Sequence, residues 1–141
     1  MGKLAKSIFI FILLSGCSMN RYLINDNGVK DKLLINVVKT LSETNQISKK
    51  PLIVINLKPY RFNKELKTSR LSFPIESIAE MNLMAREPSI GMFGSLGEGG
   101  VILITTKPFQ YRENIRPDTV YKVLMSVSVP IDFKTIQDNL K

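Results

Sequence analysis

The sequence predicts a small α+β domain with one β-sheet and several helices. Two runs, residues 52–57 and 101–106, are almost wholly apolar and rich in β-branched side chains; prolines bound the first, and glycines precede the second, which ends before Lys107-Pro108. Such runs are typical of strands that are buried on both faces. Residues 33–41 carry apolar side chains at helical spacing, which adds a helix to the sheet. The chain of 141 residues is long enough for one domain with its own core.

The first half of the domain is expected to contain one helix and two strands. The helix over 33–41 precedes Pro51, and the strand at 52–57 is followed by a long basic loop. Residues 74–78 begin with proline and predict one helical turn, because the missing N–H of proline costs nothing there. Apolar and polar residues then alternate over 79–83, which predicts a half-buried strand.

The second half is expected to add two strands and two helices. Residues 88–93 predict a short helix, and the strand at 101–106 follows a glycine-rich loop. Apolar residues alternate over 120–129, which predicts a third long strand. The final helix is expected over 132–140. Its apolar side would consist of Phe133, Ile136 and Leu140.

The N-terminus has the features of a secretory signal. Lys3 and Lys6 precede the apolar run 8–14, and small residues lead to Cys17. The run is too short for a membrane span, which needs about 20 residues. We therefore expect residues 1–16 to be removed.

Leu14-Ser15-Gly16-Cys17 resembles the lipobox of bacterial lipoproteins. The resemblance implies cleavage before Cys17 and acylation of its sulfur and new amino group, with this covalent lipid as the only added group and no cofactor. It divides the chain into a signal peptide at 1–16, a polar tether at 17–30 and a domain at 31–141. Ser18 after the cysteine resembles the context for outer-membrane sorting, so we expect a lipid anchor on the periplasmic face of that membrane.

Composition excludes several kinds of site. The chain has no histidine, and its single cysteine, Cys17, would carry lipid. A zinc site or a catalytic Cys/His pair is therefore not expected, and we expect neither a metal nor an enzymatic activity. The formal net charge is +8. Outside the cytoplasm such a charge favours acidic lipids and proteins as partners, and we expect no nucleic acid.

Residues 51–107 resemble the plug domain of TonB-dependent outer-membrane receptors, especially the SusC-like branch. The resemblance implies a small mixed β-sheet with flanking helices, in which the strands at 52–57 and 101–106 would be central. The motifs occur in the family's order: Pro51-Leu-Ile-Val-Ile55, Ile75-Glu-Ser-Ile78, Arg86-Glu-Pro-Ser89 and Phe93-Gly-Ser-Leu-Gly-Glu-Gly-Gly-Val-Ile-Leu-Ile-Thr-Thr-Lys107. The chain departs from the family at three places. Asn56-Leu57 replaces Asp-Gly, Glu87 replaces a glycine, and Leu96 replaces an arginine.

The resemblance implies a plug without a barrel of its own, because a receptor would continue into a barrel where this chain ends at Lys141. Residues 108–141 would add an extra strand and helix. The expected function is that of a lipid-anchored accessory subunit that docks on, or occludes, a separate outer-membrane β-barrel in transport or secretion. The alternative is a structural adaptor without gating, in an envelope assembly such as secretion or barrel-biogenesis machinery.

Two groups of residues are candidates for a site. The glycine loop is expected to be structural, because it lacks the Gly-Lys-Ser/Thr of a phosphate loop. It contains Gly94, Gly97, Gly99 and Gly100. A basic series recurs at about every third residue and predicts either a solvated loop or contact with an acidic protein or anionic headgroups. It consists of Lys58, Arg61, Lys64, Lys67 and Arg70. Glu76 and Glu80 are expected to be solvated.

Overall fold

The computed structural model describes residues 23, 24, 26, 32–64, 75–107 and 117–139. Cys17, Lys67 and Arg70 lie outside these residues, as do the predicted signal peptide and most of the predicted tether. The strands form one mixed sheet in the order β1-β3-β2-β5-β4-β6. They are β1 (Leu23–Ile24), β2 (Leu52–Ile55), β3 (Lys58–Phe62), β4 (Ile78–Met84), β5 (Val101–Thr106) and β6 (Val129–Pro130).

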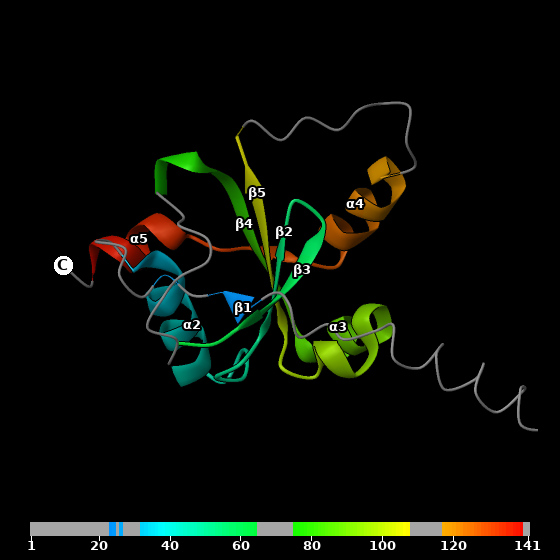
Figure 1. The fold of residues 1–141 in the computed structure, drawn as a ribbon, viewed down its shortest axis with the longest axis horizontal. Helices are drawn as coiled ribbons and strands as arrows, with labels where there is room; N and C mark the ends of the chain where they lie inside the picture. The colour runs from blue at the N-terminus through cyan, green and yellow to red at the C-terminus, as the bar shows by residue number, and fades with distance from the viewer. Residues whose placement is uncertain (1–22, 25, 27–31, 65–74, 108–116, 140–141) are drawn as a thin grey trace, which may run out of the picture.

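Helices cover both faces of the sheet (Figure 1). One face packs against α2 (Leu33–Glu43) and α5 (Phe133–Asp138), and the other against α3 (Arg86–Phe93) and α4 (Pro117–Ser126). The short 3-10 turn η2 (Ile75–Ser77) precedes β4, and the 3-10 turn η3 (Gly94–Gly97) follows α3. The predicted α+β class with a mixed sheet and flanking helices is confirmed.

The two central strands are the two predicted apolar runs. β2 and β5 are parallel neighbours, with Leu52 opposite Val101 and Ile55 opposite Ile104. Their side chains alternate between the faces, so Ile53 contributes to the core under α2 and Val54 to the core on the α3 and α4 side. Every residue of β2 is buried, as expected for a strand covered on both sides.

The segment after β2 is a strand, and the prediction of a long basic loop there was wrong for residues 58–62. β2 and β3 form a hairpin in which Ile55 pairs with Lys58, so only Asn56 and Leu57 make the turn. Both have positive φ, 47° and 67°. Positive φ at both central residues is the geometry of the type I′ turn, which is common in two-residue hairpins. Glycine, rather than leucine, is the usual second residue of such a turn. β1 pairs only with Arg61 and Phe62, so Lys58 and Pro59 lie in the part of β3 beyond that pairing, and a charged residue and a proline are common at such sheet edges.

The predicted third strand at 120–129 was wrong, because most of it is helix α4. Only Val129–Pro130 is extended, as β6, which pairs antiparallel with β4. Leu124 is buried against the sheet, although the strand pattern had placed it with the polar residues. Val120, Leu124 and Val127 are also spaced as on a helix, and Pro117 occupies the helix start that proline favours.

The described domain begins before residue 31, inside the predicted tether. β1 lies parallel to β3, with Leu23 opposite Arg61, and Ile24 is fully buried. The buried carboxylate of Asp26 accepts hydrogen bonds from the backbone N–H groups of Leu34 and Ile35. The start of α2 is thus capped by a residue outside the helix, since Lys32 at its N-cap position gives no side-chain cap.

The remaining predicted elements are present. α2, β4 and α3 cover their predicted segments, and η2 lies within the predicted turn at 74–78. α5 begins after Asp132, whose side chain accepts a hydrogen bond from the Thr135 N–H, and Leu140 of the predicted final helix lies outside the described residues. Within the described residues, no helix is both long enough and apolar enough to cross a membrane.

Candidate functional site

The glycine loop packs tightly against two neighbouring segments. A Cβ on Gly97 would lie 2.2 Å from the carbonyl oxygen of Ser89 in α3, which leaves no room for a side chain. Gly100 has φ of +81°, a conformation that L-residues with a side chain rarely adopt. Gly97 and Gly100 are therefore required for reasons of packing and of backbone conformation, respectively.

Backbone hydrogen bonds hold this loop beside the start of β2. The Ser48 N–H donates to the Gly99 carbonyl at 2.8 Å, and the Leu52 N–H donates to the Gly100 carbonyl at 3.0 Å. A Cβ on Gly99 would lie 2.5 Å from the Ser48 Oγ. The loop is thus fixed to the segment 48–52 before β5 begins.

The loop and the hairpin edge enclose a surface cavity of about 580 Å³. Arg61 from β3 and Gly99 from the loop both line it, so the structure joins one residue from each predicted group. Lys50 and Glu98 also line the cavity, as do several residues with hydroxyl or amide groups. Local sequence patterns do not assign Lys50 to this cavity, because its position near Arg61 depends on the pairing of β2 with β3.

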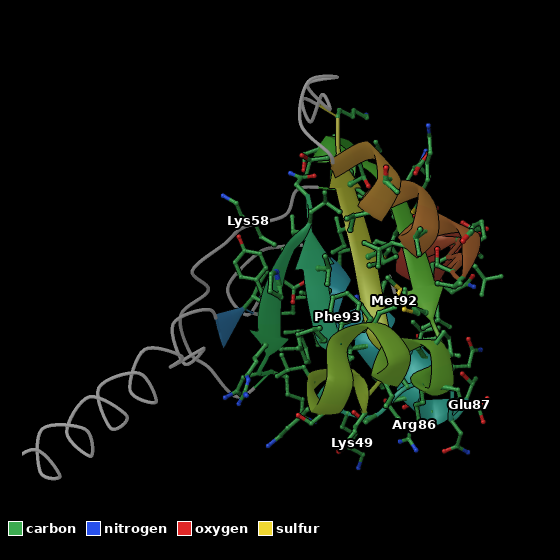
Figure 2. The ribbon with its side chains drawn as sticks, turned by 90° about the vertical axis from the view of Figure 1, so that its right-hand side faces the viewer. Lys49, Lys58, Arg86, Glu87, Met92 and Phe93 are labelled. Carbon is green, nitrogen blue, oxygen red and sulfur yellow. The ribbon has the colours of Figure 1, made fainter. Side chains whose placement is uncertain are left out.

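The rest of the basic series is spread along the edge. Lys58, Arg61 and Lys64 are all exposed, but Lys58 (Figure 2) begins β3, whereas Lys64 follows its end at Phe62. We define the basic corner as two exposed cations that line the cavity, together with an exposed lysine two residues beyond the end of β3. They are Lys50, Arg61 and Lys64.

A second feature is an exposed apolar surface on α3 and α4, the two helices that face the viewer in Figure 2. On α4, Leu124 points inward, while Val120 and Val123 are 51% and 45% exposed. Val120 and Val123 lie three positions apart on α4, and Val127, which is 42% exposed, follows the end of the helix. By their spacing these valines border the buried Leu124 on the helix surface. We call this set the α4 valine stripe. Large exposed apolar side chains also occur at Ile90, Met92 and Val129.

The acidic residues considered from the sequence lie apart. Glu76 belongs to η2 and Glu80 to β4, and both are exposed. Glu76 lines a second surface cavity, of about 590 Å³, with Lys107, Lys134 and Asp138. Among the described residues, no three of His, Cys, Asp and Glu are grouped as a metal site would need.

Comparison of the chain with protein-family models, with curated proteins and with solved structures finds no match.

Proposed function

We propose that this protein is a lipid-anchored, plug-like subunit that docks on a separate outer-membrane β-barrel. Two parts of the sequence support the proposal. Leu14-Ser15-Gly16-Cys17 resembles a lipobox, and residues 51–107 resemble a receptor plug. The second segment supplies the four adjacent strands β3, β2, β5 and β4, which are the centre of the sheet.

The main structural observation in support of the docking proposal is the exposed apolar surface on α3 and α4. α4 covers one face of the sheet with Leu124, whereas the valine stripe beside it stays 42–51% exposed. Complete burial of an exposed valine contributes about 1.5–3 kcal/mol, so a partner that covers these half-exposed valines gains about half of that for each. Exposed apolar patches of this kind mark protein-interaction sites.

The chemistry of the partner follows from the proposed location. A protein anchored by its N-terminal lipid to the outer membrane meets the periplasmic ends of the barrels in that membrane. Docking there would place the α4 valine stripe against the wall or the turns of a barrel. The plug resemblance favours a barrel over other envelope proteins.

Affinity purification from detergent-solubilised envelopes tests this proposal. We expect the tagged full-length protein to recover an outer-membrane β-barrel. The double variant Val120→Glu and Val123→Glu should lose that barrel, because it places two carboxylates in an apolar contact. The matched control, Gln46→Glu and Asn139→Glu, adds two carboxylates to exposed positions next to α2 and α5, on the other face of the sheet, and should retain it.

Three results would count against the proposal. The wild type could recover no barrel, the control could lose the barrel as fully as the valine variant, or the valine variant could keep it while melting normally. Recovery of an envelope assembly that contains no barrel would favour the adaptor function instead. Unchanged envelope permeability after deletion would argue against a role in gating.

A further inference from the structure

The place where the chain enters the sheet limits how far the domain can stand from its proposed lipid anchor. Leu23 is paired with Arg61, and Ile24 and Asp26 are buried, so the domain holds the chain from residue 23 onward. Six residue steps separate Cys17 from Leu23. Fully extended, they span at most about 20 Å. The β1–β3 edge must therefore lie close to any membrane that holds the lipid.

The same edge carries the basic corner. Arg61 lies directly opposite Leu23, across one strand spacing of about 4.8 Å. Lys50 lines the same cavity as Arg61, and Lys64 follows the end of β3. Among the described residues that line this cavity, Lys50 and Arg61 are cationic and Glu98 is acidic.

We propose that the basic corner binds the anionic headgroups of the bilayer in which Cys17 is anchored. This inference rests on the lipid anchor of the proposed function and adds an orientation to it. The β1–β3 edge would face the membrane. β6 would point away, because it is the opposite edge of the sheet, five strand spacings or about 24 Å from β1.

The size of the effect follows from membrane electrostatics. Charges on an anionic surface act over about 8 Å at physiological salt, a distance that the short tether allows the corner to reach. Each lysine or arginine near such a surface favours the bound orientation by a factor of about five. Removing all three cations should therefore weaken the bound orientation roughly 100-fold.

A distance measurement on the lipidated full-length protein tests this orientation. With Cys17 acylated, a single introduced cysteine is the only free thiol. Ser95→Cys places a fluorophore beside the corner, because Ser95 lines the same cavity, and Val129→Cys places one on the opposite edge. Energy transfer to a headgroup-labelled acceptor is then compared in vesicles of phosphatidylcholine alone and with 30% phosphatidylglycerol.

We expect transfer from position 95 to rise with phosphatidylglycerol and to exceed transfer from position 129. The rise should vanish at high salt and in the triple variant Lys50→Gln, Arg61→Gln and Lys64→Gln. The matched control, Lys39→Gln, Lys107→Gln and Lys134→Gln, removes three exposed cations elsewhere and should keep it. Equal transfer in both kinds of vesicle, or equal loss in both triple variants, would overturn the inference.

Further outcomes distinguish the headgroup contact from the lipid anchor and from binding to an acidic protein. Protein that fails to float with phosphatidylcholine vesicles would contradict the lipid anchor itself, and the inference with it. Protein that floats but gives the same energy transfer with and without phosphatidylglycerol would support the lipid anchor and overturn only the headgroup contact. If the triple variant instead loses a protein partner from envelope extracts, with unchanged transfer, the corner binds an acidic protein and the inference is wrong.

Discussion

The carboxylate of Asp26 accepts a hydrogen bond from the backbone N–H of Ile35 at 3.1 Å, across nine residues of sequence. The neighbouring N–H of Leu34 donates to the other carboxylate oxygen. These N–H groups belong to the first turn of α2, where the helix itself offers no acceptor. The segment that the sequence predicted to be a tether thus supplies a cap for the helix and a strand for the sheet.

Replacing Asp26 with alanine should destabilise the domain. The change leaves buried N–H groups of α2 without an acceptor, which costs about 1–3 kcal/mol in the free energy of unfolding. Denaturant unfolding of the purified protein measures this cost. An unchanged midpoint would show that the contact between Asp26 and α2 contributes nothing to stability.

The same carboxyl should make stability depend on pH. Burial raises the pKa of Asp26 above its ordinary value of 3.8, although the N–H groups of Ile35 and Leu34 oppose the shift. The folded state then binds this proton more tightly than the unfolded state. The unfolding free energy of the wild type, relative to Asp26→Asn, should therefore fall as pH rises from about 4 through the folded-state pKa, and level off above it. A difference that grows with pH would show that the ionised carboxylate is the stabilising form.

Gly97 should not tolerate alanine. The added Cβ would lie 2.2 Å from a backbone oxygen of Ser89, and relieving such overpacking costs about 1–3 kcal/mol. Gly91 provides the control, since a Cβ there meets nothing within 4 Å and the residue lies within α3. Gly91→Ala should leave the melting temperature unchanged or raise it, because alanine favours helix. Equal effects at both positions would refute the account of the glycine loop.

Cys17→Ser should leave an uncut precursor without lipid. No other residue of the chain has a thiol that could take the acyl group. The mass of the protein isolated from membranes shows whether the signal peptide was removed. Its partition into detergent shows whether lipid was added. A serine variant that still has the processed mass and partitions into detergent would contradict the lipobox interpretation.

The parts of the fold that the sequence predicted correctly are those set by local patterns. β2 and β5 are continuous apolar runs, and α2 has apolar residues at helical spacing, so each pattern identifies its element. β3 was missed because Leu57 occupies a positive-φ position that glycine normally signals. The side chain of Asn56 stabilises this turn by hydrogen bonding with Thr106, a partner 50 residues away.

α4 was missed because its apolar residues fit two periods. Taken alone, positions 121–129 alternate like a strand, whereas Val120, Leu124 and Val127 follow a helix. The helix is favoured where Leu124 packs on the sheet beside Leu103 and Val54, a tertiary contact that no local pattern contains. For the same reason Lys50 could not be assigned to the cavity, and Asp26 could not be assigned to α2.

The most direct test of the docking claim is site-specific photocrosslinking in cells from position 123 of the full-length protein. Val123 is 45% exposed at the centre of the α4 valine stripe, so a photoreactive residue there reports what covers the stripe. The account predicts an adduct with an outer-membrane β-barrel protein, and no such adduct from a photoreactive residue at the exposed position 134 of α5. Adducts with no barrel at position 123, or the same adducts at both positions, would contradict it.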